Sequence, residues 1–234
     1  MRIAVIGAMD EEVELLIDHL ENRIEEEIGG SFFYRGYIQG QEIILVKSGI
    51  GKVNAAISTS ILLEKFQPDA VINTGSAGGF NPALKVGDLV ISKEVRYNDV
   101  DATVFGYEFG QVPQMPAKYE ADETLVQAAK KCAINEKLTT LEGLVVSGDS
   151  FMSDDSRVAF LKNTFVEPQC AEMEAGAIAQ VCYRFNVPFV IIRSLSDIAG
   201  QDAKQSYDQF LKKASVHSAN LVLSMIDELK NRQI

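Results

Sequence analysis

The sequence lacks several features that define other classes of protein. It contains no tryptophan, only six prolines and two histidines, and none of its three cysteines belongs to a Cys-x-x-Cys pair. The scarcity of proline and a hydrophobic fraction of 47% exclude a disordered or collagen-like chain. A chain of 234 residues buries a sizeable core without crosslinks, so an odd number of cysteines favours reduced, buried thiols in a cytoplasmic protein.

Long apolar runs and positive charge are also scarce. No apolar run approaches the roughly 18 residues that a transmembrane helix needs. The apolar start, Met1–Met9, has no charged leader region and no cleavage site, so it predicts a first strand instead of a signal peptide. The 22 lysines and arginines stand against 33 acidic residues, which gives a net charge of −11. Such a surface repels phosphate backbones and anionic lipids, which argues against nucleic acids and membranes but not against an uncharged nucleoside.

Short apolar runs alternate with helical patterns along the chain. Buried strands are predicted at Ile3–Ile6, Ile43–Val46, Ala70–Ile72, Leu89–Ile91, Leu144–Val146 and Phe189–Ile192. Helical spacing of apolar residues recurs over 13–20, 125–132, 175–182 and 211–229. The stretch Arg23–Val46 has little helical pattern and predicts strands in succession. We therefore expect a single α/β domain over residues 1–234, with a mixed, twisted sheet flanked by helices on both faces.

One long segment, Asn98–Ala121, has no periodic pattern. It contains two glycines and two prolines among several aromatic residues. Irregular segments of this length inside a compact domain are usually functional or disordered. Its apolar content favours a lid or an interface over disorder.

Polar and small residues follow the predicted strands, at the end where ligands bind in open α/β sheets. Four such stretches are Gly7–Glu12, Asn73–Gly79, Ser147–Phe151 and Arg193–Asp197, and Glu172–Gly176 opens a helix. We expect them to converge on one crevice that carries carboxylates and one arginine. Taken singly, each carboxylate is more often a helix-terminus or turn residue, so the argument depends on their combination.

Other site motifs are missing or incomplete. No Gly-x-x-x-x-Gly-Lys-Ser/Thr occurs, which excludes a P-loop nucleoside triphosphatase. Gly49-Ile50-Gly51 imitates part of a dinucleotide fingerprint, but Asn54 stands where the third glycine belongs. His19 and His217 lie inside helical patterns without a second ligand nearby in the pattern, so we expect no metal site and no cofactor.

In combination, Gly7–Glu12, Gly75–Gly79, Glu172–Gly176 and Arg193–Asp197 resemble the 5′-methylthioadenosine/S-adenosylhomocysteine nucleosidases. That family belongs to the larger group of purine nucleoside phosphorylases and nucleosidases, and the resemblance extends over essentially the whole chain. It implies hydrolysis of the N-ribosidic bond of both nucleosides, with release of adenine and the 5-thio-substituted ribose.

The resemblance implies three carboxyl groups with separate tasks. Asp197 matches the general acid that protonates N7 of adenine, a task that burial supports because it raises the pKa of an acid. Glu12 matches the general base for the attacking water on the opposite face of the ribose, as in inverting hydrolases. Glu174 matches the residue that accepts hydrogen bonds from the ribose hydroxyls.

The resemblance also assigns the remaining contacts with substrate. Met173 is placed at the sugar, and Ser76 and Arg193 hold the water and Glu12. Phe151 and Met152 contact adenine, and Ser196 supports Asp197. The 5′-alkylthio end is lined by Met9, Ile50 and Tyr207. Ala102, Phe105 and Pro113 lie in the segment without pattern, which this family lends to the neighbouring subunit, so a homodimer is implied. Tyr207 and Ala102 replace the phenylalanine and the larger aliphatic residue expected in many relatives. The preference among 5′-substituents, including 5′-deoxyadenosine and aminofutalosine, therefore stays open.

Two other functions remain possible at this point. A purine nucleoside phosphorylase would cleave the same bond with phosphate, but phosphate needs cationic or nested N–H contacts, and Asp10-Glu11-Glu12 would repel it. A nucleoside-binding protein on the same fold would have no use for an acid and a base together. Both alternatives are less favoured than the hydrolase.

Overall fold

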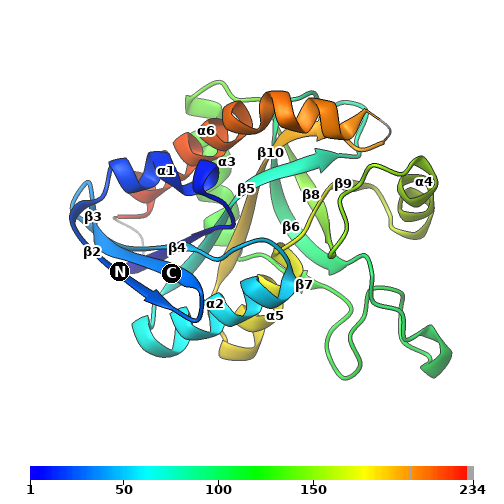
Figure 1. Cartoon of the computed structure of the whole chain (residues 1–234), viewed down its shortest axis with the longest axis horizontal. Helices are drawn as coiled ribbons and strands as arrows, with labels where there is room; N and C mark the ends of the chain where they lie inside the picture. Colours follow the sequence, from blue (N-terminus) through cyan, green and yellow to red (C-terminus); the bar gives the residue numbers. More distant parts are fainter. Residues whose placement is uncertain (201, 231–234) are drawn as a thin grey trace.

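A mixed sheet runs through the protein and carries helices on both faces (Figure 1). The computed structural model describes residues 1–200 and 202–230. Its strands are β1 (Arg2–Gly7), β2 (Glu21–Ile28), β3 (Ser31–Ile38), β4 (Gln41–Lys47), β5 (Ala70–Gly79), β6 (Leu89–Tyr97), β7 (Tyr119–Glu120), β8 (Thr140–Ser147), β9 (Pro168–Glu172) and β10 (Phe189–Ile198). Its α-helices are α1 (Asp10–Asp18), α2 (Lys52–Phe66), α3 (Glu123–Asn135), α4 (Asp155–Thr164), α5 (Ala175–Phe185) and α6 (Ala203–Leu229).

Two apolar layers separate the sheet from its helices. Alternate residues of β1 enter opposite layers, because successive side chains of a strand point to opposite faces. Ile3 and Val5 pack with α1, α3 and α6, whereas Ala4 and Ile6 pack with α2 and α5. Figure 1 shows these two groups of helices on either side of the sheet, with α4 at one end. A third, smaller cluster packs α4 against the ends of β8 and β9.

Part of the sheet closes on itself. The strands pair in the order β10-β6-β8-β9-β5-β1-β4-β3-β2, and β10 also pairs with β5. The strands β5, β10, β6, β8 and β9 therefore form a ring, while β1, β4, β3 and β2 extend from β5 as an open sheet. Both parallel and antiparallel pairs occur in the ring. The junction of the ring and the open sheet is β5, the strand at which the candidate site is built.

Along one edge of β5 the pairing partner changes. Ala70–Asn73 pairs in parallel with β1, whereas Gly78 and Gly79 pair antiparallel with β9. Residues 74–77 between these two ladders pair with β10 on the opposite edge and have no strand partner on this edge. The sheet is therefore open at Ser76, where backbone groups are free to bind something other than a strand.

The predicted fold class is confirmed, and all six predicted strands lie within observed strands. The four helical patterns correspond to α1, α3, α5 and α6, although α1 ends at Asp18, so that Leu20 lies just beyond it. The stretch Arg23–Val46 contains strands in succession, as expected. The assignment of residues 1–234 to one nucleosidase domain stays a prediction.

Sequence patterns missed α2, α4, β9 and the two-residue strand β7. The buried side of α2 includes Ser58 and Thr59 among its apolar residues, which blurs the amphipathic pattern. The helix α4 buries only Val158 and Leu161 and begins after Asp154, whose side chain accepts a hydrogen bond from the backbone N–H of Arg157 at 2.8 Å. The segment 98–121 is mostly irregular and extends from the body of the protein between β6 and α3 (Figure 1). In the part of the chain that the structure describes, no helix combines the length and the hydropathy needed to cross a bilayer.

Candidate active site

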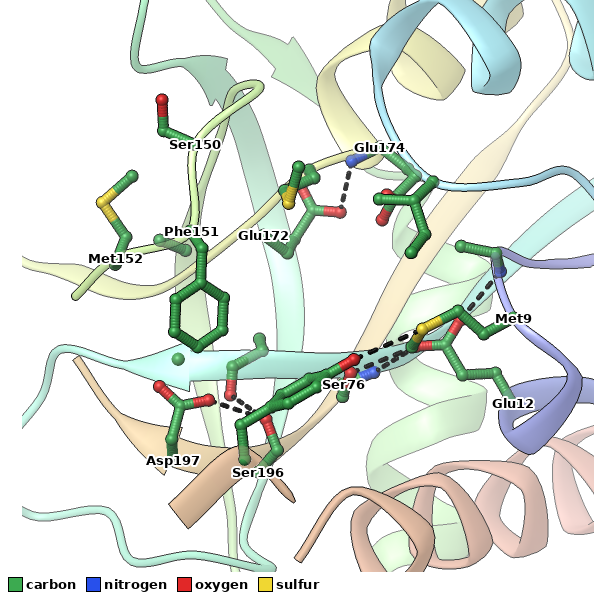
Figure 2. A pocket seen from close by; sticks show the side chains of 17 residues that line it. Met9, Glu12, Ser76, Ser150, Phe151, Met152, Glu172, Glu174, Ser196 and Asp197 are labelled. Carbon is green, nitrogen blue, oxygen red and sulfur yellow. Dashed lines mark hydrogen bonds between the residues drawn. The ribbon is translucent and has the colours of Figure 1, made fainter. Parts of the chain in front are cut away.

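A cavity of about 320 Å³ opens beside the unpaired edge of β5. This volume lies within the usual range for small-molecule sites. Figure 2 shows the side chains that surround it. Its lining is mostly apolar and consists of Ala8, Met9, Glu12, Ile50, Ser76, Ala77, Gly78, Ser150, Phe151, Met152, Ala171, Glu172, Met173, Glu174, Ser196, Asp197 and Tyr207.

The carboxylate of Glu12 is held by hydrogen bonds at the unpaired edge. Glu12 lies in the first turn of α1, next to two other acidic residues that favour a helix N-terminus. Its Oε1 accepts hydrogen bonds from the N–H of Ser76 at 2.9 Å and from the Ser76 hydroxyl at 3.2 Å. Its Oε2 accepts a hydrogen bond from the N–H of Ala8 at 2.8 Å. Three donors thus orient a carboxylate that is 1% exposed.

Asp197 lies beside an irregularity of β10. The register between β10 and β5 shifts between Leu195 and Asp197, and such bulges redirect side chains near ligand sites. The Ser196 hydroxyl donates to Oδ1 of Asp197 at 2.8 Å. Burial raises the pKa of Asp197 to about 6, although the hydrogen bond from Ser196 opposes this shift. The carboxyl group therefore exchanges a proton close to neutral pH.

Arg193 lies behind the cavity wall and is 1% exposed. Its Nη2 forms an ion pair with Glu172, donates to Oδ1 of Asn73 at 2.7 Å and lies 3.5 Å from Oε2 of Glu174. Its Nη1 donates to the backbone carbonyl of Ser76 at 3.3 Å. These contacts engage both terminal nitrogens of the buried guanidinium, whereas its Nε has no hydrogen-bond partner among the described residues.

Glu174 faces the cavity just before α5. The backbone N–H of Gly51 donates to its Oε1 at 2.9 Å. Burial, followed by the negative charge of Glu172, raises the pKa of Glu174 to about 8, and the positive charge of Arg193 opposes this effect. Glu174 thus binds its proton more tightly than Asp197 does.

Gly75 allows Arg193 and Glu12 to approach the same point of β5. A Cβ atom at this position would lie 2.3 Å from Nη1 of Arg193 and 2.6 Å from Oε1 of Glu12. Any side chain would displace both groups. A glycine is required here by close approach.

Aromatic and sulfur-containing side chains lie at the open part of the cavity. The rings of Phe151 and Tyr207 meet edge to face with their centres 5.5 Å apart, and Phe151 remains 42% exposed. The hydroxyl of Tyr207 lies 3.3 Å from the sulfur of Met9. In the view of Figure 2, Phe151 and Asp197 lie at one end of the cavity and Met9 and Glu12 at the other.

Comparisons with known proteins agree on one family. A profile of the Phosphorylase superfamily matches residues 2–227. A 5′-methylthioadenosine/S-adenosylhomocysteine nucleosidase from Halalkalibacterium halodurans is 64% identical over 228 residues, which cover 97% of this chain and 99% of the relative. The chain belongs to this nucleosidase family.

Solved structures of nucleosidases in the same family share the fold. The enzyme from Neisseria meningitidis, in complex with methylthio-immucillin-A, is 47% identical with a TM-score of 0.96, and the match covers 97% of this chain and 99% of the other. The enzyme from Colwellia psychrerythraea, in complex with adenine, is 45% identical with a TM-score of 0.97, and the match covers 100% and 98% of the two chains.

The structure brings most of the predicted residues of the nucleosidase site together. Eleven of them line the cavity: Met9, Glu12, Ile50, Ser76, Phe151, Met152, Met173, Glu174, Ser196, Asp197 and Tyr207. Arg193 supports the wall from behind instead of lining it, and its ion pairs are with Glu172 and Glu174, not with Glu12. Arg193 nevertheless lies near Glu12, because both approach the same point of Gly75, and its role in holding the water and Glu12 in place stays a prediction.

Three predicted residues do not line the cavity of their own chain. Ala102 is buried, whereas Phe105 is 79% exposed and Pro113 is exposed as well. All three lie in the segment 98–121, away from the cavity lining. Their contribution to a neighbouring nucleosidase site stays a prediction.

Sequence reasoning gave no role to Glu172, although it quoted this residue in a motif. Glu172 lines the cavity and pairs with Arg193. The sequence could have indicated this role, because Glu172 lies only two positions before Glu174, between a strand and a helix. Of the residues that the structure describes, none form a group of three or more His, Cys, Asp and Glu able to hold a metal ion.

Proposed function

We propose that this protein hydrolyses the N-ribosidic bond of 5′-methylthioadenosine and S-adenosylhomocysteine, releasing adenine and the 5-thio-substituted ribose. The observation that carries the proposal is a pair of buried carboxyl groups, Glu12 and Asp197, that reach one apolar cavity from α1 and β10. The curated relative named for both nucleosides and the structures with methylthio-immucillin-A and adenine support this choice of substrates.

Asp197 acts as the general acid in this proposal. Adenine is a poor leaving group as an anion, and a proton on N7 allows it to depart neutral. A general acid works best when its pKa is close to the working pH, and that of Asp197 is about 6. Ser196 fixes one oxygen of the carboxyl group and leaves the other free to donate its proton. Phe151 covers adenine, and the backbone of Met152 reads its edge.

Glu12 acts as the general base on the attacking water. The donors from Ala8 and Ser76 fix both carboxylate oxygens, so that the base is oriented before substrate arrives. The carboxylates also stabilise the positive charge that develops on the ribose in an oxocarbenium-like transition state. The water delivers hydroxide to C1′, its proton goes to Glu12, and the bonding electrons leave with the protonated adenine.

Glu174 accepts hydrogen bonds from the ribose hydroxyls, with Met173 against the sugar. This acceptor role favours the ionised carboxylate, whereas Asp197 must hold a proton. The active enzyme therefore carries one proton on this pair of carboxyl groups. With pKa values of about 6 for Asp197 and about 8 for Glu174, that form is most populated between pH 6 and pH 8, where it competes with the form that holds the proton on Glu174.

A phosphorolytic reaction is disfavoured by the charges at the cavity. No lysine or arginine occurs in its lining within residues 1–200 and 202–230. Arg193 is already engaged by Glu172 and Asn73. A phosphate ion would meet Glu12, Glu172 and Glu174 without a free cation to bind it.

A homodimer completes the proposal. The helices α2 and α5 form a groove with exposed apolar residues, among them Val53 at 69% and Phe185 at 42% exposure. The exposed Phe105 lies on the extended segment, from which it reaches the cavity of a second copy together with Ala102 and Pro113. We also propose a cytoplasmic location, with which three buried cysteines outside any disulfide are compatible.

Mixed dimers test the shared site. Phe105→Ala raises KM, and Glu12→Gln abolishes turnover, when each variant is assayed alone. A heterodimer of the two variants contains one doubly defective site and one intact site. The isolated heterodimer is expected to have about half of the wild-type activity, and an equimolar mixture after complete subunit exchange about a quarter, since sites act independently in this scheme. An active monomer in light scattering, or no recovery in a verified heterodimer, contradicts the shared site.

A single assay tests the reaction itself. The protein is incubated with methylthioadenosine, with and without phosphate, while free adenine and the sugar product are followed. We expect adenine and free methylthioribose in both samples. A phosphate-dependent sugar 1-phosphate would show a phosphorylase, and saturable binding without adenine release would show a binding protein.

A further inference from the structure

Glu172, the last residue of β9, joins two parts of the site through one oxygen atom. Its side chain is 2% exposed. Its Oε2 accepts hydrogen bonds from the backbone N–H groups of Glu174 at 2.9 Å and of Ala175 at 2.8 Å. The same oxygen forms the ion pair with Nη2 of Arg193. Glu172 thus ties the start of α5 to the guanidinium on β10.

The partners of Glu172 determine where Glu174 points. The N–H group of Glu174 belongs to the residue that faces the ribose in the proposed function. Beyond this backbone contact, the Glu174 carboxyl group is held by Gly51, whose N–H donates to Oε1 at 2.9 Å. Its Oε2 lies 3.5 Å from Arg193, at the limit of a hydrogen bond. A small turn of the guanidinium would convert this distant contact into a full ion pair.

Glu172 and Glu174 compete for the same cation. The charged and titratable groups that act on Glu174 are Glu12 on α1, Glu172 on β9, Arg193 on β10 and Tyr207 on α6. Arg193 contacts Glu172 more closely than it contacts Glu174. The other oxygen of Glu172 is buried and has no hydrogen-bond partner among the described residues. The negative charge of Glu172 acts on Glu174 and raises its pKa, whereas Arg193 lowers it.

We propose that Glu172 is a positioning residue, which holds Arg193 away from Glu174 and fixes the backbone of Glu174 so that its carboxylate remains available to the ribose. The inference rests on the proposed function, in which Glu174 accepts hydrogen bonds from the sugar. Without the charge of Glu172, Arg193 pairs with Glu174 and withdraws this acceptor from the substrate. Glu172 touches neither reacting atom in this scheme.

The test compares Glu172→Gln with the wild type in steady-state hydrolysis of methylthioadenosine over a range of pH. Glutamine keeps the size and one acceptor of glutamate but removes its charge. We expect KM to rise about tenfold, as for loss of one charge-assisted hydrogen bond, with kcat lowered less than about threefold. Two changes in this variant lower the pKa of Glu174: the charge of Glu172 is lost, and Arg193 pairs with Glu174 instead. The alkaline limb of kcat/KM therefore moves to lower pH.

Two further variants separate position, charge and folding. Glu172→Asp keeps the charge but is one methylene too short to reach all three donors, so KM rises while the alkaline limb stays near that of the wild type. Gln169→Ala is the matched control on β9, because it removes a side chain that bonds Asn81 and the carbonyl of Glu167 away from the cavity. We expect Gln169→Ala to leave KM and the pH limbs unchanged. Thermal unfolding verifies that each variant is folded.

Several outcomes overturn the proposal. In Glu172→Gln, a uniform loss of kcat with unmoved KM and pH limbs would show a merely structural role, and unchanged kinetics would show no role. If Glu172→Gln does not fold, a wild-type KM in Glu172→Asp rejects the positioning. Failure of the proposed function itself is recognised separately, because the wild type would then release no adenine, and the inference falls with it.

Discussion

Ser76 donates two hydrogen bonds to the same oxygen of Glu12, one from its backbone at 2.9 Å and one from its hydroxyl at 3.2 Å. The backbone donor is free because residues 74–77 of β5 have no strand partner on that edge. A break in sheet pairing therefore orients the proposed base. The shorter of the two bonds does not depend on the side chain of residue 76.

This arrangement predicts unequal effects of substitution at the two positions. Glu12→Gln removes the base and is expected to lower kcat about 10³-fold or more, within the range for acid–base catalysis. Ser76→Ala removes only the longer bond, so a loss of about tenfold or less in kcat/KM is expected. Adenine release measures both. Comparable losses in the two variants would contradict a base held mainly by the backbone.

Asp197→Asn is expected to abolish adenine release and to stabilise the fold above pH 6. The pKa of Asp197 rises from 3.8 to about 6 on folding. The native protein thus loses stability as pH rises from below 3.8 through 6, by about 3 kcal/mol at 1.36 kcal/mol per pKa unit. Asparagine avoids this cost.

Thermal unfolding at pH 4 and pH 8 checks the stability change. The melting temperature of Asp197→Asn should exceed that of the wild type by several degrees more at pH 8 than at pH 4. Ser196→Ala serves as the control, because it removes the hydrogen bond to Asp197 while the Asp197 carboxyl group stays buried. A difference independent of pH would reject burial as the source of the shift.

The pH profile of kcat/KM is expected to be bell-shaped, with limbs near pH 6 and pH 8. Below the lower limb Asp197 and Glu174 both hold a proton, and above the upper limb neither of this pair does. Glu174→Gln leaves only Asp197 to titrate, so its activity should fall from about pH 6 upward without an acid limb due to this pair. Initial rates of adenine release provide the profile.

Gly75→Ala is expected to lower kcat/KM at least about 100-fold, since the added methyl group would displace both Arg193 and Glu12. Gly30→Ala is the matched control, because Gly30 has φ of +79° but no atom within 4 Å of an added Cβ. It should cost about 1 kcal/mol of stability and leave the kinetics unchanged. Normal activity in Gly75→Ala would show that the approach of the two side chains is dispensable.

Tyr207→Phe is expected to change preference at the 5′ end without stopping the reaction. It removes the hydroxyl that lies 3.3 Å from the sulfur of Met9, while the ring contact with Phe151 remains. We expect kcat for methylthioadenosine within about threefold of the wild type, as for loss of one weak contact. The ratio of kcat/KM for methylthioadenosine and S-adenosylhomocysteine should shift. An unchanged ratio would remove Tyr207 from the 5′ pocket.

The strands were predictable because they depend on local patterns, and most of the cavity lining was predictable because its motifs resemble one family. Buried runs such as Ile3–Ile6 and Phe189–Ile192 predict buried strands, and the polar residues after them indicate where ligands bind. The acid, the base and the ribose contact came from motifs whose combination resembles one family. The structure places Glu12, Glu174 and Asp197 around one cavity.

Long-range pairing was beyond the reach of sequence patterns. Nothing local in β5 or β10 shows that the two strands pair and close a ring with β9. The ion pair of Arg193 with Glu172 follows from that closure, because it joins the end of β9 to the middle of β10. The helices α2 and α4 were missed for a different reason, since their buried faces carry polar residues or few apolar ones.

The change of partner along β5 makes some positions of the site harder to substitute than others. The proposed base, Glu12, depends on a defect in backbone pairing, which a point mutation cannot easily repair. Met9, Ile50 and Tyr207 belong to a loop or helix at the rim, outside that defect. Substitutions at the rim can thus retune which 5′ group enters, while the cleavage chemistry is inherited unchanged with the sheet.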